Sequence, residues 1–170
     1  SVLHLFCGKI AAGKSTLAEQ FAQLPNSILI SQDHWLARLF PGEIKTMSDF
    51  ARCSGRLHAA MGTHIASVLR LGISVSLDFP ANTRSQRQWM RGIIEDGNAE
   101  HQLHYLEVSD ETCKARLHLR NAAGRHDYVV TDAEGTHHLK VNEPGPLVSA
   151  SEVGALLSVI AEEVQAGDLW

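Results

Sequence analysis

The stretch at residues 8–15 constrains this chain more than any other. Its sequence, Gly-Lys-Ile-Ala-Ala-Gly-Lys-Ser, follows the pattern G-x-x-x-x-G-K-S. An apolar run at residues 2–7 precedes it, and residues 16–24 follow with apolar side chains at helical spacing. The two glycines allow backbone angles that other residues resist, so successive N–H groups can point at an anion before a helix. The stretch therefore predicts a phosphate-binding loop, or P-loop, between a strand and a helix.

Nucleoside triphosphate binding follows from the side chains that the loop carries. Lys14 can reach the β- and γ-phosphates, and the Ser15 hydroxyl can bind Mg²⁺. The predicted nucleotide contacts are Gly8, Ala11, Ala12, Gly13, Lys14, Ser15 and Thr16, with Arg116 from further along the chain. ATP is expected rather than GTP, because the sequence has no Asn-Lys-x-Asp guanine-binding motif.

Length and composition favour one globular domain. The chain has 170 residues, of which 44% are hydrophobic and 20% charged, and this is enough for a compact domain with its own core. Its formal net charge of −4 lacks the basic excess that a nucleic-acid-binding surface usually needs. We therefore expect a single P-loop domain over residues 1–170 that binds a small molecule and no nucleic acid.

The spacing of cysteines and histidines offers no metal or disulfide framework. Cys7, Cys53 and Cys113 form an odd set without metal or redox spacing, and the ten histidines show no convincing zinc-ligand geometry. Reduced thiols favour the cytoplasm. We expect no signal peptide, because the N-terminal apolar run is only about six residues long and lacks a basic flank. We expect no membrane partner, because no run approaches the roughly 18 apolar residues of a membrane helix. The oligomeric state stays open.

Apolar runs and helical patterns alternate along the chain. Predicted strands occupy residues 2–7, 27–31, 73–79, 102–108 and, more weakly, 138–141. Predicted helices occupy residues 16–24, a short stretch ending at 39, 48–71 as one helix or two, 84–96, 111–121 and about 151–164. This alternation predicts βαβ units, and hence an α/β fold with a parallel sheet. The carboxyl ends of the strands should meet at one edge, where ligand sites of α/β proteins form.

Two aspartates follow predicted strands at that edge. Asp33 comes directly after the second strand, where it could accept a proton from a hydroxyl that attacks the γ-phosphate. Aspartate also favours helix N-caps, and both roles can hold together. Asp78 ends the third strand, where it could hold Mg²⁺ with Ser15, contact the acceptor, or form a turn before Pro80. We predict a catalytic role for Asp33 and a metal site formed by Ser15 and Asp78.

Arginines cluster after the fourth strand. Arg116 and Arg120 lie four residues apart on one face of the predicted helix, and Arg125 follows in a polar segment. Arginine can stabilise the equatorial oxygens of a transferring phosphoryl group, and a segment that closes over a nucleotide excludes water. The alternative is a solvated helix face. We predict a lid over about residues 121–135, with Arg120 and Arg125 catalytic, and a loop at 142–146 where a purine ring could rest.

These segments resemble one branch of the P-loop kinases, which contains zeta-toxin-like and chloramphenicol phosphotransferase-like proteins with an AAA-type ATP-binding domain. The residues that carry the resemblance are 8–16, 31–35, 77–79 and Arg116-x-x-x-Arg120-Asn121, within a match from residue 2 to about 132. The resemblance implies a three-layer P-loop NTPase fold, with a five-stranded parallel sheet in the order 2-3-1-4-5 and helices on both faces. It also implies that Asp33 is the base toward the acceptor hydroxyl, and that Arg120 and Arg125 belong to the lid.

The expected activity is that of an ATP- and Mg²⁺-dependent kinase, or phosphotransferase. Its acceptor would be a hydroxyl of a small molecule such as an antibiotic, a sugar or a nucleotide sugar. Catalysis is assigned to Lys14, Asp33, Arg120 and Arg125, and metal binding to Ser15 and Asp78. Two alternatives stay open: a nucleic-acid 5′-hydroxyl kinase, and an ATP-binding switch or ATPase without acceptor-dependent turnover. The sequence does not specify the acceptor.

Overall fold

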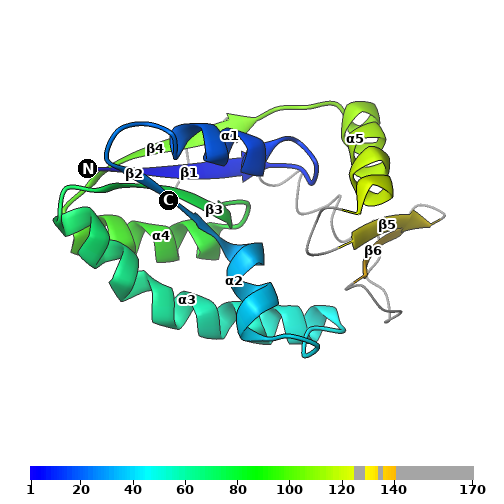
Figure 1. The fold of residues 1–170 in the computed structure, drawn as a ribbon, viewed down its shortest axis with the longest axis horizontal. Coiled ribbons are helices and arrows are strands. Elements are labelled where there is room, and N and C mark those ends of the chain that lie inside the picture. The colour runs from blue at the N-terminus through cyan, green and yellow to red at the C-terminus, as the bar shows by residue number, and fades with distance from the viewer. Residues whose placement is uncertain (125–128, 134–135, 141–170) are drawn as a thin grey trace.

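Four parallel strands form the sheet at the centre of the protein (Figure 1). The computed structural model describes residues 1–124, 129–133 and 136–140. The strands of the sheet are β1 (Val2–Gly8), β2 (Ser27–Ser31), β3 (Ser74–Pro80) and β4 (Glu100–Leu106). β1 lies between β3 and β4, and β2 pairs with the far side of β3. The order β2-β3-β1-β4 confirms the prediction for the first four strands.

The prediction of a fifth strand in this sheet is wrong for the described part of the chain. β6 (Thr136–Lys140) instead pairs antiparallel with β5 (Val129–Ala133) in a separate two-stranded sheet. The link of residues 134–135 suits an antiparallel pair, whereas parallel pairing needs a crossover of about a dozen residues. Val129 and Val130 are strong strand formers. The predicted lid at 121–135 therefore contains a strand rather than a polar loop alone.

Helices cover both faces of the sheet, which gives the predicted three layers (Figure 1). α1 (Lys14–Phe21) packs on one face, and α3 (Met47–Arg70) packs on the other with α4 (Arg84–Gly97) beside it. α2 (Gln32–Leu39) and α5 (Asp110–Ala123) follow the carboxyl ends of β2 and β4. The segments that carry the predicted site residues therefore lie at one edge of the sheet. In the described ranges, no helix is long and apolar enough to span a membrane.

The hydrophobic core lies between the sheet and the pair α3 and α4. Leu5 of β1 and Leu77 of β3 have no exposed surface, and burying such a side chain stabilises the fold by about 1.5–3 kcal/mol. All three cysteines are free and buried: Cys7 in β1, Cys53 in α3 and Cys113 in α5. Their burial agrees with the expectation that Cys7 acts as a small core residue.

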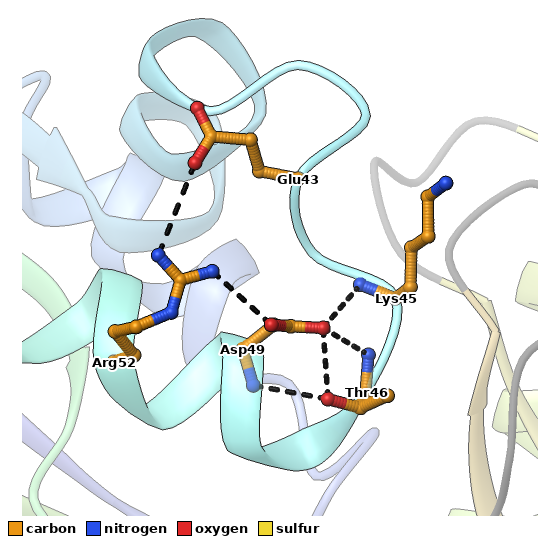
Figure 2. A network of polar contacts seen from close by, with 5 residues as sticks. All are labelled: Glu43, Lys45, Thr46, Asp49 and Arg52. Atoms are coloured by element: carbon orange, nitrogen blue, oxygen red, sulfur yellow. Dashed lines mark hydrogen bonds and ion pairs between the residues drawn. The ribbon is translucent and has the colours of Figure 1, made fainter.

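A capping box fixes the start of α3 (Figure 2). Thr46 Oγ1 accepts a hydrogen bond from the Asp49 N–H at 3.1 Å, and Asp49 Oδ2 accepts one from the Thr46 N–H, also at 3.1 Å. The same carboxylate accepts from the Lys45 N–H, and Arg52 pairs with both Asp49 and Glu43. The Thr46 hydroxyl, followed by Arg52, lowers the pKa of Asp49 to about 2. The helical region that follows is one helix, not two.

α3 and α4 approach each other closely at Gly97. A Cβ at this position would lie 3.1 Å from Cβ and from Cδ1 of Leu69. The sequence predicts Gly97 as the residue that stops the helix, but Gly97 lies within α4 and Asn98 carries the left-handed φ of 48°. Asn98 therefore ends the helix, and the missing side chain of Gly97 allows the two helices to pack.

Candidate active site

The P-loop connects β1 to α1, as predicted. Gly8 and Gly13 have φ angles of 149° and 106°, and Ala11 has a φ of 58°. A Cβ at Gly8 would lie 2.8 Å from the carbonyl oxygen of Leu106 in β4, so only glycine fits there without a shift of the backbone. Gly13 is the N-cap of α1. The positive φ angles fold the backbone into the kind of N–H nest that binds anions.

The Lys14 ammonium lies within the loop. Its Nζ donates hydrogen bonds to the carbonyl oxygens of Gly8 and Lys9, both at 2.7 Å. Burial lowers the pKa of Lys14 from its ordinary value, and the charge of Asp78 acts in the opposite direction. The amine is therefore held by two backbone carbonyls, next to the nest that would receive phosphate.

Asp78 joins the P-loop to the end of β2. Its carboxylate accepts hydrogen bonds from the hydroxyl of Ser15 at 3.1 Å and from that of Ser31 at 3.2 Å. Hydroxyl and carboxylate oxygens are the ligands that Mg²⁺ prefers. The donor set of Ser15 and Asp78 fits that ion, and the structure brings together the two residues predicted to bind it.

A cavity of about 840 Å³ opens at the P-loop. Its wall includes the predicted site residues Ala11, Gly13, Lys14, Ser15, Thr16, Asp33, Asp78, Arg116 and Arg120. Gly8 and Ala12 are buried and do not belong to this wall. The cavity also includes Gln32 and Phe50. Its volume is in the range of small-molecule and cofactor sites.

Asp33 lies in the first turn of α2, at the carboxyl end of β2. Ser31 holds the N-cap position of that helix, so the alternative prediction of Asp33 as the N-cap is wrong. Asp33 lines the cavity, and its charge acts on both Lys14 and Arg120. The carboxylate therefore lies within electrostatic reach of the loop lysine and of an arginine from α5.

The two arginines of α5 have different partners. Arg116 Nη1 donates a hydrogen bond to the carbonyl oxygen of Ala12 at 3.1 Å, so Arg116 supports the P-loop. Burial lowers the pKa of the Arg120 guanidinium, and the charge of Asp33 opposes this shift. Arg120 Nε is buried and has no hydrogen-bond partner among the described residues. Arg120 is half-buried and lines the cavity, which favours the predicted site role over a solvated helix face, and Arg125 lies outside the described residues.

A salt bridge also fastens the start of α5 to the P-loop. Lys9 Nζ pairs with Asp110 in the first turn of the helix, and this bond is the main cause that raises the pKa of Lys9. Together with the bond from Arg116, it gives α5 two direct contacts with the loop. The helix that carries Arg120 is thus held against the loop that would bind phosphate.

Two polar residues of the site escape prediction from the sequence. Gln32 is buried at the cavity wall, where its Oε1 lies 2.8 Å from His58 Nε2. Burial lowers the pKa of His58, which stacks on Trp89 with ring centroids 4.4 Å apart. Asn82 binds the backbone of Gly8. Gln32 and His58 are 26 residues apart in the sequence, and Gly8 and Asn82 are 74 residues apart, so no local spacing predicts either contact. The only sequence signal at residue 82 is the predicted start of a helix.

The fold and the site define a P-loop protein with an α/β, NTPase-like fold. The chain belongs to the AAA domain family, whose sequence profile matches residues 3–144. No curated protein matches the sequence. The APS kinase CysC of Mycobacterium tuberculosis, solved in complex with AMPPNP and APS, is 18% identical, and the alignment covers 93% of this chain and 98% of that one with a TM-score of 0.52. The crystal structure of APE1195 is also 18% identical, covering 95% and 94% of the two chains with a TM-score of 0.48. The likeness to the APS kinase is a likeness of fold.

The predicted loop at 142–146 and the predicted final helix at about 151–164 lie outside the described residues. The predicted place for the purine ring therefore has no counterpart in the described structure. The phosphate end of the predicted nucleotide site, by contrast, lies wholly within it. The chemistry that can be argued from contacts is therefore that of the phosphates and of a group that attacks them.

Proposed function

We propose that this protein is an ATP- and Mg²⁺-dependent kinase that phosphorylates a hydroxyl of a small molecule such as an antibiotic, a sugar or a nucleotide sugar. One observation carries the proposal: Lys14, Asp33 and Arg120 come from three different elements and line the same cavity. A protein that only binds nucleotide needs the lysine alone, whereas transfer to a hydroxyl also needs a proton acceptor and a further cation. The resemblance noted above makes the zeta-toxin-like and chloramphenicol phosphotransferase-like branch the best assignment.

In the proposed reaction, Lys14 and the P-loop N–H groups bind the β- and γ-phosphates of ATP. Asp33 accepts the proton of the acceptor hydroxyl as its oxygen forms a bond to the γ-phosphorus. The bond between that phosphorus and the bridging oxygen breaks, and ADP leaves with the oxygen and its electron pair. Arg120 donates hydrogen bonds to the equatorial oxygens of the transferring group, and the resemblance assigns a similar role to Arg125.

Three further residues support the phosphates. Ser15 and Asp78 would hold Mg²⁺, which supplies positive charge to the phosphates when it is bound. Arg116 acts on the P-loop through the carbonyl of Ala12, so we assign it to positioning the loop rather than to direct contact with the transferring group. Substitution of Arg116 should therefore weaken nucleotide binding more than it slows transfer.

The acceptor would occupy the part of the cavity that the phosphates leave open. Gln32 and Phe50 contribute an amide and an aromatic ring to that wall. Arg52, which follows Phe50 in α3, is paired with Asp49 and Glu43. These two side chains would contact the apolar and hydroxyl-bearing parts of the acceptor. We expect the reaction in the cytoplasm, with no nucleic acid or membrane as partner.

A screen of acceptors tests the proposed function. The full chain is incubated with ATP and Mg²⁺ and with aminoglycosides, chloramphenicol, free sugars, nucleotide sugars, APS or a 5′-hydroxyl oligonucleotide. APS belongs to the panel because the solved APS kinase was crystallised with it. ADP release is followed by a coupled assay, and products are identified by mass spectrometry. Acceptor-dependent ADP release with a phosphorylated small molecule is the expected result.

Other outcomes identify the alternatives. Phosphorylation of the oligonucleotide alone would make the protein a 5′-hydroxyl kinase, with the strong salt dependence of nucleic-acid binding. Binding of ATP without transfer to any acceptor would make it a switch or an ATPase. Lys14→Ala should abolish both nucleotide binding and turnover, because the loop loses its cation. Lys45→Ala is the matched control, because Lys45 is exposed and only its backbone joins the capping network of α3.

A further inference from the structure

Just before the P-loop, the end of β1 stays paired with β4 but loses its pairing with β3. Leu5 pairs with Leu77 of β3, but the next residue of β1, Phe6, pairs with Pro80. The register shifts between Leu5 and Phe6, and Pro80 is the last residue of β3. In the strand pairing of the described residues, Gly8 at the end of β1 therefore has no backbone partner in β3.

An asparagine side chain takes the place of that missing partner. Asn82 Oδ1 accepts a hydrogen bond from the Gly8 N–H at 3.0 Å, and Asn82 Nδ2 donates one to the Gly8 carbonyl oxygen at 3.2 Å. A side-chain amide offers one acceptor and a donor group in the same plane, as a peptide does. Because Gly8 presents one N–H donor and one carbonyl acceptor, Asn82 Oδ1 must face the N–H and Nδ2 must face the carbonyl.

The backbone of Asn82 is hydrogen-bonded to two side chains of α4. Its own N–H donates to Gln86 Oε1 at 3.0 Å. Its carbonyl oxygen accepts a hydrogen bond at 3.2 Å from Nη1 of Arg87, which has no exposed surface. Arg87 Nη1 also donates to the carbonyl of Ala81 at 3.2 Å. The segment that presents the amide to Gly8 is thus anchored to α4.

The Gly8 carbonyl is shared with the catalytic lysine of the proposed mechanism. Lys14 Nζ donates to this oxygen at 2.7 Å, alongside the bond from Asn82. When the ammonium turns toward a phosphate, it must give up a carbonyl partner. A buried carbonyl that loses its only donor raises the free energy of the bound state. Gly8 avoids this because the bond from Asn82 remains.

We propose that Asn82 is a positioning residue for the nucleotide. It fixes the first peptide of the P-loop and keeps the Gly8 carbonyl hydrogen-bonded while Lys14 moves to the phosphates. The inference rests on nucleotide binding by the P-loop, which is part of the proposed function. It concerns the loop backbone and does not depend on the identity of the acceptor.

The affinity for AMPPNP tests this role. Isothermal titration of the full chain with AMPPNP and Mg²⁺ should give an affinity about tenfold lower for Asn82→Ala than for the wild type. Asn82→Asp should lose at least as much, because a carboxylate can accept from the Gly8 N–H but cannot donate to its carbonyl. The thermal unfolding of each apo variant is measured in parallel.

Thr83→Ala is the matched control. Thr83 is the N-cap of α4 and the neighbour of Asn82, but its side chain accepts from Gln86 N–H and does not touch Gly8. It should lower the unfolding temperature and leave the AMPPNP affinity within about twofold of wild type. An Asn82→Ala variant whose affinity matches that of Thr83→Ala would overturn the proposal, as would an Asn82→Asp variant with wild-type affinity.

Failure of the proposed function has a different signature. A wild-type protein that binds no AMPPNP would overturn the nucleotide site and this inference together. A wild-type protein that binds AMPPNP and transfers phosphate, with Asn82 variants that bind equally well, would overturn the inference alone. The titrations report nucleotide binding, and the acceptor screen reports transfer.

Discussion

Asp33, Lys14 and Arg120 each belong to a different element, α2, α1 and α5, and each faces the same cavity. Neither Lys14 nor Asp33 is the N-cap of its helix: the N-cap of α1 is Gly13 and the N-cap of α2 is Ser31. Conservative substitutions at these positions should therefore change chemistry more than folding. This separation makes the proposed roles accessible to single-residue tests.

Substitution of Asp33 tests the proposed proton acceptor most directly. Asp33→Asn keeps the shape of the side chain but removes its basicity, so transfer to the acceptor found in the screen should fall by about 10²–10⁴-fold. AMPPNP affinity, measured by titration calorimetry, should stay close to that of the wild type. Asp96→Asn removes the same charge from an exposed position in α4 and serves as the control. Transfer by Asp33→Asn at a near wild-type rate would show that Asp33 is not the base.

Some of these site residues could be predicted from the sequence, and others could not. Asp33 and Asp78 each follow an apolar run, and strand ends of a parallel sheet meet at one edge. Their proximity to the P-loop is therefore a consequence of local pattern plus one topological rule. Asn82 and Gln32 act through bonds to Gly8 and His58, which depend on how β3 bends and how α3 packs. No spacing in the sequence encodes that geometry.

At the scale of elements, the contact between α3 and α4 depends on a missing side chain. Gly97→Ala would put a Cβ 3.1 Å from Leu69, so the mutation should destabilise the fold by about 1–3 kcal/mol. Gly92→Ala is the matched control in the same helix, since a Cβ there meets nothing within 4 Å. That change should be neutral or stabilise by up to about 1 kcal/mol through helix propensity. Urea unfolding measures both, and equal effects would contradict the packing argument.

The start of α3 depends on the reciprocal bonds of Thr46 and Asp49 (Figure 2). Thr46→Ala removes the hydroxyl that caps the helix and should destabilise by about 1 kcal/mol in urea unfolding at neutral pH. The folded-state pKa of Asp49, about 2, lies below its ordinary value of 3.8. Its contribution is therefore present above pH 3.8 and is lost as the pH falls toward 2. The difference between wild type and Thr46→Ala should shrink over that acidic range.

The exposed pair of Arg91 and Glu95 in α4 provides the comparison. Arg91→Ala should change the free energy of unfolding by less than about 0.5 kcal/mol, because exposed ion pairs contribute little. A Thr46→Ala effect no larger than that of Arg91→Ala would mean that the capping box does not stabilise α3.

At the scale of the whole molecule, three imidazoles link stability to pH. His4 and His104 lie on adjacent strands with His4 Nδ1 3.2 Å from His104 Nε2, and His58 of α3 stacks on Trp89 of α4. Burial lowers the pKa of all three from 6.5, and for His4 the charge of His104 adds to the shift. Below pH 6.5 the unfolded chain therefore binds more protons than the folded one, and acid should destabilise the protein.

Urea unfolding at about pH 7.5 and about pH 5.5 measures this linkage. The free energy of unfolding should fall toward acid, by at most about 1.4 kcal/mol per pH unit for each imidazole. His104→Gln should reduce the fall, because it removes one proton-binding group and its repulsion on His4. His64→Gln, at an exposed position of α3, should leave it unchanged. Equal stability of the wild type at both pH values would contradict the expected direction.

The architecture as a whole follows from the alternation of strands and helices. That alternation predicts the parallel sheet, and the resemblance to P-loop kinases implies its order, which holds through four strands. The prediction fails after α5, where β5 and β6 form their own antiparallel pair. Both the apolar pattern at residues 138–141 and the resemblance predict a fifth parallel strand. Val129 and Val130 favour a strand in the preceding segment, and the short link between β5 and β6 permits only antiparallel pairing.

The three buried cysteines have a practical consequence for how this protein can be studied. Cys7 lies in the central strand, Cys53 in the long helix and Cys113 in the helix that carries Arg120. A thiol reagent reaches each one only when its surroundings open. The rate at which each sulfur is alkylated, read by peptide mass spectrometry, therefore reports the opening of three different elements without any introduced label. Slower alkylation of Cys113 in the presence of AMPPNP would reveal how far the nucleotide steadies α5.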